Sequence, residues 1–267
     1  MAWWLLGAGL FAIALPFLGF ALLGRRWRLS WRAFGIGAAT FFVAQVVLRL
    51  PWIGPLTAWL QRHGASTPPA ALGVVLLAAV TAGLFEEGAR YLAYRLALPR
   101  PRPGEALAMG LGHGGLESIL LVGLNGVVTA ALLLVLAAHP SALPAALAEQ
   151  LRRGVAPALA GGPALPLLGA LERLSALALQ VALSVVVAVA VLRRSFALWL
   201  GAFGVHTGVD ALAGFLPLWT RSLPLTEAAV LAAALLAAAW ALRLLRSDAW
   251  PGSGEEAPAA TGPAGTS

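Results

Sequence analysis

The sequence predicts an all-α fold, a polytopic transmembrane bundle of about seven helices. The 267 residues are 60% hydrophobic and 11% charged, and their mean hydropathy is +0.85, well above the values of soluble domains. Several apolar runs reach about twenty residues, the length at which a helix crosses the hydrocarbon core of a bilayer. Because short connections join these runs, residues 1–247 are predicted to form one transmembrane domain, in which a core over 70–216 carries the site.

The first half of the chain is expected to contribute four helices, over 3–23, 31–50, 70–98 and 104–138. The first is interpreted as a retained helix, because its basic cluster follows the apolar run, whereas a signal peptide has the reverse order. A loop rich in Pro, Gly and Ser is predicted over 51–69, and the prolines of 99–103 are expected to stop the third helix. The fourth run is too long for one straight span, so a tilt or a break is expected at Gly114-Gly115 or at 123–126.

The second half is expected to contribute three helices, over 167–192, 196–219 and 225–245. Before them, residues 140–166 are of mixed composition, and the centre of this segment, 143–155, is compatible with either a short surface helix or a plain loop. From Asp248 onward the chain is rich in Pro, Gly, Ala and Ser, so 248–267 is predicted to be a disordered cytoplasmic tail.

Arginine supplies the whole positive charge of the chain, whose formal net charge is +7. The arginines cluster at the ends of apolar runs, which is typical of membrane anchoring, and no nucleic-acid partner is predicted. If the N-terminus lies outside, eleven arginines are cytoplasmic, Arg90 is internal, and six are on the outer side: Arg49, Arg62, Arg152, Arg153, Arg173 and Arg221. This bias predicts an integral protein of the bacterial plasma membrane with a cytoplasmic C-terminus.

Polar residues inside three of the predicted helices form the candidate site. A charged side chain at a helix centre in a bilayer costs roughly 2.5–3.5 kcal/mol, so such residues are usually functional. The three sets are Glu86, Glu87 and Arg90; His113 and Glu117; and His206 and Asp210. Each set contains a pair four residues apart, which places the pair on one helix face, and Glu86 is therefore expected to pair with Arg90.

The three sets are predicted to meet because they lie at similar depths. At 1.5 Å per residue, Glu86, His113 and His206 lie ~18, ~13 and ~15–17 Å from the cytoplasmic ends of their helices. Small residues beside them are expected to let the helices approach closely: Gly88, Ala89, Gly112, Gly114, Gly115, Gly204 and Gly208.

Two hydrolytic schemes are compatible with these residues. In the first, Glu86, His113 and His206 bind zinc or another divalent metal, and the remaining glutamate is the general base. In the second, no metal is needed: Glu86 or Glu87 activates water together with His113, while His206 and Asp210 stabilise the oxyanion. Both schemes hydrolyse an amide or a similar acyl bond.

Each candidate also has a purely structural interpretation. Glu86 and Arg90 would then form a buried ion pair that holds the helices in register, and the histidines would hydrogen-bond neighbouring helices. Glu117, like Asp210, is expected to orient the histidines rather than to act as a ligand. Glu172 is expected to lie nearer the outer surface.

The motifs Glu86-Glu87-Gly88-Ala89-Arg90, Gly112-His113-Gly114-Gly115-Leu116-Glu117 and His206-Thr207-Gly208-Val209-Asp210, in this order on three helices, resemble the YhfC-type intramembrane metalloproteases. That group is similar to the CAAX prenyl protease (CPBP/Abi) and PrsW membrane peptidases. The resemblance implies that the first motif's Glu activates water, the second motif's His helps to bind water or a metal, and the third motif's His and Asp hold the oxyanion or complete the metal shell.

The sequence departs from the CAAX protease pattern, so cleavage of prenylated peptides is not implied. Two residues rather than three separate the Glu-Glu pair from Arg90, Met109 stands in place of Phe, and Asp210 stands where many relatives have Asn.

The predicted function is an intramembrane peptidase that cuts a membrane-associated peptide from a cytoplasm-facing cavity. One alternative is a transporter or a proton or ion relay that uses the same cluster, and another is an inactive scaffold that binds partner helices. A transport site usually needs access from both faces and an inverted repeat, and the sequence shows no convincing repeat. Neither the substrate nor the oligomeric state is predicted.

Overall fold

A computed structural model describes residues 1–63, 68–160 and 162–250 of the chain. In these ranges the secondary structure consists of α-helices and two short π-helical segments, η1 and η2. In chain order they are α1 (Ala2–Trp27), α2 (Trp31–Phe41), η1 (Phe42–Arg49), α3 (Leu50–His63), α4 (Pro68–Ala97), α5 (Pro103–Ser118), η2 (Ile119–Gly123), α6 (Leu124–Ala138), α7 (Ala145–Ala160), α8 (Ala164–Leu192), α9 (Phe196–Thr220) and α10 (Leu223–Leu245).

Seven stretches of these helices are long and apolar enough to cross a membrane, which confirms the predicted all-α transmembrane bundle. Two of them are composite. Residues Trp31–His63 join α2, η1 and α3, and residues Pro103–Ala138 join α5, η2 and α6. The expected break in the fourth run therefore falls at η2, which ends at Gly123.

The loop predicted over 51–69 is wrong for its first part, because the helix continues to His63. Pro51 lacks a backbone N–H and would clash with the carbonyl four residues earlier in a regular α-helix. Here that residue is Val47, inside η1, and the wider turns of a π-helix leave room for the ring. The segment left open at 143–155 belongs to α7.

The hydrophobic core is densest in the second half of α8, near Leu192. Residues 183–191 are all buried, so this stretch is enclosed on every side, as expected for a helix that is apolar all round. Its neighbours in the core include Tyr94 of α4, Met109 of α5 and Ala237 of α10. This end of the bundle is therefore closed by packed hydrocarbon.

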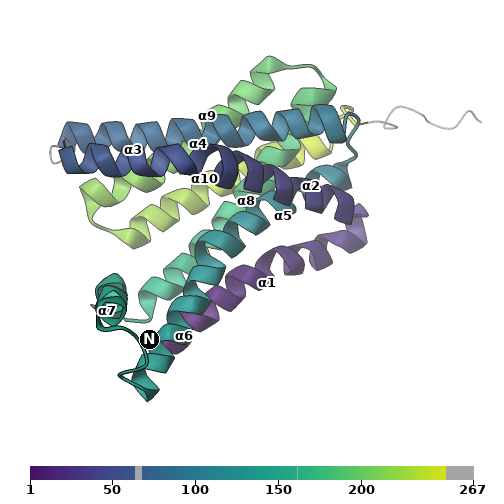
Figure 1. Cartoon of the computed structure of the whole chain (residues 1–267). Coiled ribbons are helices and arrows are strands. Elements are labelled where there is room, and N and C mark those ends of the chain that lie inside the picture. Colours follow the sequence, from purple (N-terminus) through teal and green to yellow (C-terminus); the bar gives the residue numbers. More distant parts are fainter. Residues whose placement is uncertain (64–67, 161, 251–267) are drawn as a thin grey trace, which may run out of the picture.

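Two groups of helices diverge toward the opposite end of the molecule. In Figure 1, α3, α4, α9 and α10 lie on one side and α1, α6 and α7 on the other, with α5 and α8 between them. Consistent with this view, the neighbours of α6 in the described chain include α1, η2 and α7, and those of α3 are η1 and α4. We call this end, which holds the C-terminus of α3 and the N-termini of α4, α8 and α10, the arginine-poor end.

Two of the six arginines assigned to the outer side are interior. Arg49 is 9% exposed and Arg173 is 8% exposed. The arginine-poor end thus has four arginines on its surface (Arg62, Arg152, Arg153 and Arg221). The difference in surface arginines between the two ends is therefore larger than the sequence indicated.

The chain after α10 packs against the bundle as far as it is described. Trp250 is buried, and its indole nitrogen donates to the carbonyl of Leu244 at 3.0 Å. Asp248 pairs with Arg193 at 2.9 Å. Residues 248–250 thus contact the helices, whereas the remainder of the predicted tail, 251–267, lies outside the described residues.

Glycines let α2 and α5 approach closely, but only some of the glycines that were predicted to allow close helix packing do so. A Cβ atom on Gly112 would lie 1.9 Å from the Phe34 carbonyl oxygen, and one on Gly37 would lie 2.0 Å from the Met109 oxygen. Gly88, Gly204 and Gly208 have nothing within 4 Å of the corresponding position. Among the glycines predicted to let helices approach closely, those of α5 therefore do so, and those of the first and third motifs do not.

We expect Gly112→Ala to destabilise the protein by about 1–3 kcal/mol, because the added methyl group forces α2 away from α5. Gly208→Ala is the matched control. It adds the same atom in open space and is expected to be neutral or to stabilise α9 by about 0.5–1 kcal/mol. Thermal unfolding of both variants in detergent measures the difference, and equal melting temperatures would contradict this account of the α2–α5 contact.

Candidate functional site

Glu86, His113 and His206 come together from α4, α5 and α9. The Nε2 atom of His113 lies 2.9 Å from Glu86 Oε2, and the Nε2 atom of His206 lies 3.7 Å from the same oxygen. All three residues are buried, with exposures of 5%, 0% and 3%. One carboxylate oxygen thus faces two imidazole nitrogens inside the bundle.

Glu87 binds His206 and Arg90. Its Oε1 lies 2.6 Å from His206 Nδ1, and both of its oxygens accept from Arg90 Nη1, at 2.6 and 2.7 Å. The expected Glu86–Arg90 pair is therefore wrong, because Arg90 pairs three residues back instead of four. Arg90 Nη2 donates to Gln180 of α8, and that contact places the guanidinium beside Glu87.

His206 is oriented by these contacts. With Nδ1 held by Glu87, Nε2 points toward Glu86, and it also lies 3.8 Å from Asp210 Oδ2. A carboxylate that binds one imidazole nitrogen fixes the ring and makes the other nitrogen more basic. Asp210 is partly exposed, at 37% of its side chain, and is the member of the cluster nearest to open space.

Two glutamines that sequence reasoning missed complete the surroundings of Glu86. Gln45 of η1 donates to Glu86 Oε1, and Gln180 Nε2 donates to Glu86 Oε2 at 2.9 Å. Gln45 in turn accepts from Arg49 at 2.8 Å. Two features of the sequence could have indicated these glutamines. Each is a polar residue inside a long apolar run, where burial is costly, and Gln45 and Arg49 have the same four-residue spacing as the motif pairs.

Glu117 faces α8 instead of orienting the histidines as predicted. It accepts from Arg173 Nη1 at 3.1 Å and from Gln180 Nε2 at 2.9 Å. The His113 ring turns toward α4, whereas Glu117, one turn later, lies against α8. Gln180 joins the two sets by donating to Glu86 and Glu117 alike, and Arg173 also binds Glu172.

Two cavities reach this cluster. One, of about 310 Å³, lies between α8, α9 and α10, and the other, of about 500 Å³, is bounded by η1, α3, α4 and α9. Both are lined by Glu86, Glu117 and Asp210, and Glu87 lines neither. Of the two adjacent glutamates, Glu86 therefore faces the cavities and Glu87 is enclosed.

Both cavities extend from Glu86 toward the arginine-poor end. Their walls run from Gln180 back to Gly169 on α8, and from His206 on to Pro217 on α9. If the arginine-rich end is cytoplasmic, as the sequence predicts, the predicted cytoplasm-facing cavity would require space at that end, where the second half of α8 is buried on all sides. Sequence patterns show which residues are apolar but not which end of a bundle is tightly packed.

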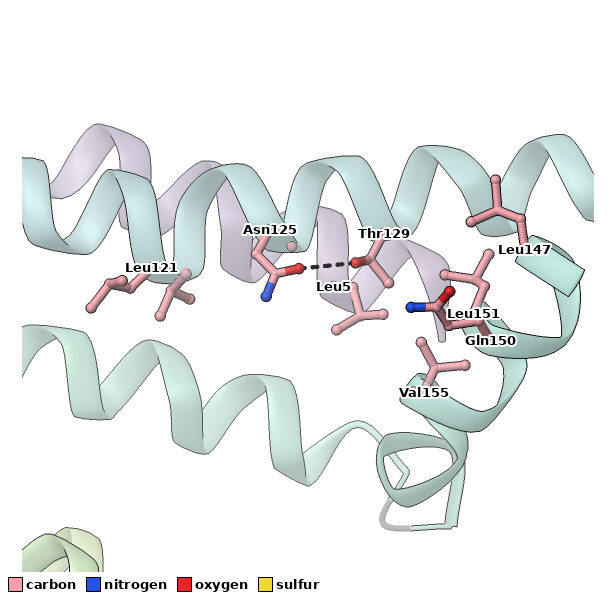
Figure 2. Close-up of a pocket in the computed structure, with 11 residues that line it drawn as sticks. Leu5, Leu121, Asn125, Thr129, Leu147, Gln150, Leu151 and Val155 are labelled. Carbon is pink, nitrogen blue, oxygen red and sulfur yellow. Dashed lines mark hydrogen bonds between the residues drawn. The ribbon is translucent and has the colours of Figure 1, made fainter. Parts of the chain in front are cut away.

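A third cavity, of about 540 Å³, lies between α1, α6 and α7 (Figure 2). Its polar groups include Asn125, Thr129 and Gln150, and Thr129 donates to Asn125 at 3.3 Å. Among the residues that the structure describes, no titratable side chain lines it. It shares Leu121 with the larger cavity at the cluster, so η2 forms a common wall.

The donor types at the cluster suit a divalent metal, although no three His, Asp or Glu side chains in the described part of the chain stand ready as a metal site. Imidazole nitrogens and a carboxylate are the usual ligands of catalytic zinc. The Glu87–His206 contact is the support that metal-binding histidines commonly have. In contrast, the buried Nδ1 of His113 has no hydrogen-bond partner among the described residues.

Comparison with known proteins identifies a family and a curated relative. The family model described as YhfC intramembrane metalloprotease matches residues 11–230. An uncharacterized membrane protein, YhfC of Bacillus subtilis (strain 168), is 32% identical over 201 residues, which cover 70% of this chain and 74% of the relative. No solved structure matches the chain significantly.

Proposed function

Because this chain belongs to the YhfC intramembrane metalloprotease family, we propose that it is an intramembrane peptidase in which Glu86 activates the attacking water. The substrate is a membrane-associated peptide or protein. The observation that supports this proposal is the position of Glu86: it lines both cavities while its carboxylate lies beside the Nε2 atoms of His113 and His206.

In this proposal the two adjacent glutamates have different roles. Glu86 is the general base, because it alone of the pair faces the cavities. Glu87 is a positioning residue: it holds His206 by Nδ1, and Arg90 neutralises its charge. Asp210, at the cavity wall beside His206, is available to contact the substrate.

Hydrolysis proceeds by addition and elimination at the peptide carbonyl. Glu86 removes a proton from water as the water oxygen bonds to the carbonyl carbon, and protonated His206 stabilises the resulting oxyanion by a hydrogen bond from Nε2, keeping its proton. Glu86 then gives its proton to the amide nitrogen as the C–N bond breaks. The products are a carboxylic acid and an amine, and the enzyme returns to its starting protonation state.

This hydrolytic scheme uses no metal. A divalent metal, when bound, would be held by Glu86, His113 and His206, which would then be ligands instead of base and hydrogen-bond donor, and it would supply Lewis acidity for the carbonyl and a more acidic water. We expect purified protein to retain metal and His206→Ala to lose it, as measured by elemental analysis before and after chelation. His139→Ala is the matched control, because His139 is exposed at the end of α6. Equal metal content in the two variants would contradict this ligand set.

A search for fragments tests the peptidase activity before any substrate has been identified. Membranes of cells that produce the wild-type chain, His206→Ala or His139→Ala are compared by mass spectrometry of new protein termini. We expect fragments with the wild type and with His139→Ala only. His206→Ala leaves Glu87 paired with Arg90, so loss of fragments would not arise from an unpaired buried charge. Identical fragments in all three samples would reject the proposal.

The transport alternative fits the structure less well. Alternating access needs a path to both faces of the membrane. Beyond the cluster, away from the arginine-poor end, the described helices are closed by residues such as Tyr94, Met109 and Val185, each with no exposed surface.

A further inference from the structure

We infer that the substrate reaches Glu86 from the arginine-poor end of the bundle, the outer side of the membrane, as an extended segment of a membrane protein. This inference rests on the proposed peptidase function, and it adds the side of entry and the conformation of the substrate. The evidence is the direction of the cavities, the closure of the opposite end, and the shared residues at the point where the cavities meet.

The direction is the same on every helix that borders the cavities. On α4 the wall runs from Glu86 back to Val74, and on α8 it runs from Gln180 back to Gly169. On α9 the wall runs forward to Pro217, and on α10 it begins at Leu223, the first residue of that helix. Because these helices alternate in direction, all four walls lead to the same end of the bundle.

Hydrogen bonds and packing close the other end. The hydroxyl group of Tyr94 lies 2.7 Å from Ser184 Oγ, and Ser184 donates to the Ala106 carbonyl at 2.9 Å. Tyr94, Ser184 and Ala106 have no exposed surface. These contacts join α4, α8 and α5 directly below the cluster, so a peptide could not pass there without separating three helices.

The length of the route indicates an extended chain. Glu86 lies ~27 Å along α4 from Pro68, at 1.5 Å per residue. An extended segment covers this distance with about eight residues, at roughly 3.3 Å each. The two cavities share Glu86, Glu117 and Asp210 at their inner ends, so such a segment can enter along either cavity and place a peptide bond at Glu86. In a helix, the same bond would be enclosed by its own side chains.

The arginine distribution assigns the open end to the outer face. Eleven arginines lie near the closed end, against four on the surface of the arginine-poor end. Positive residues favour the cytoplasmic side. The substrates are therefore segments exposed in, or drawn from, the outer half of the bilayer.

Single cysteines test the inference well, because the natural chain contains none. Ala213→Cys places a thiol at an exposed position that lines both cavities. Ser141→Cys, in the α6–α7 turn, marks the arginine-poor end, and Arg100→Cys, between α4 and α5, marks the closed end; both positions are exposed. Intact cells are treated with a membrane-impermeant maleimide before or after permeabilisation.

We expect the thiols at positions 213 and 141 to react in intact cells, and the thiol at position 100 to react only after permeabilisation. The inference is overturned if the thiol at position 213, like that at position 100, reacts only after permeabilisation, or if it does not react at all. It is also overturned if the two marker positions show the reverse orientation. Labelling needs no catalysis, and the same pattern is expected with Glu86→Gln added. A failure of the peptidase proposal would instead leave the labelling unchanged and appear as missing fragments.

Discussion

Replacing Glu86 by glutamine is expected to lower the rate of peptide cleavage by about 10²–10⁴-fold, the usual contribution of a general base. The glutamine side chain has the same length, and its one amide oxygen can still accept from either Gln45 or Gln180, both of which donate to Glu86 in the wild type. It cannot accept a proton from water. The rate is measured with purified protein in lipid vesicles, on a substrate identified from its fragments.

Two further variants give this prediction its controls. Glu149→Gln changes an exposed carboxylate on α7, remote from the cluster, and should leave the rate unchanged. Glu87→Gln should retain more activity than Glu86→Gln, because its amide oxygen can still accept from His206 Nδ1. If Glu87→Gln were inactive and Glu86→Gln active, the assignment of the base would be reversed.

Replacing Arg90 by methionine is expected to destabilise the protein by about 3–5 kcal/mol, because it leaves the Glu87 carboxylate buried without its partner. Both residues have no exposed surface, so water cannot solvate the remaining charge in the folded state. The free energy of unfolding in detergent, or the melting temperature, measures the loss.

The double variant Arg90→Met/Glu87→Leu separates charge from packing. It removes both charges and should recover part of the lost stability, since apolar replacement of a buried ion pair is often neutral or better. It should remain inactive, because His206 has lost its orienting carboxylate. An Arg90→Met protein as stable as the wild type would show that Glu87 is not held as a buried anion.

Composition and periodicity were sufficient to predict the transmembrane class and the number of spans. Each span is a helix of more than twenty residues that contains a strongly apolar stretch, and the required length comes directly from the thickness of the bilayer. The helix over 50–63 was missed because its prolines and glycines usually mark loops, whereas η1 allows the helix to continue through Pro51. Local residue preference cannot reveal that neighbouring turns widen to accommodate a proline.

The candidate site was predicted from the cost of burying charge, and the same reasoning failed where arginine was assumed to lie at the surface. Arg173 and Arg49 belong to the polar network because Glu117 and Gln45 are available to them inside the bundle. The expected partner of Arg90 was also wrong, because residues three and four positions away share a face and spacing alone does not choose between Glu87 and Glu86. Gln180, ninety residues later, decides between them, and only the tertiary structure brings it there.

The most direct measurement of the proposed chemistry is mass spectrometry of cleavage fragments formed in water enriched in ¹⁸O. If Glu86 activates water, the new C-terminal carboxylate of each fragment carries one ¹⁸O atom, and Glu86→Gln yields almost no fragment. Fragments without the label, or labelled fragments formed at the same rate by Glu86→Gln, would contradict hydrolysis by this carboxylate.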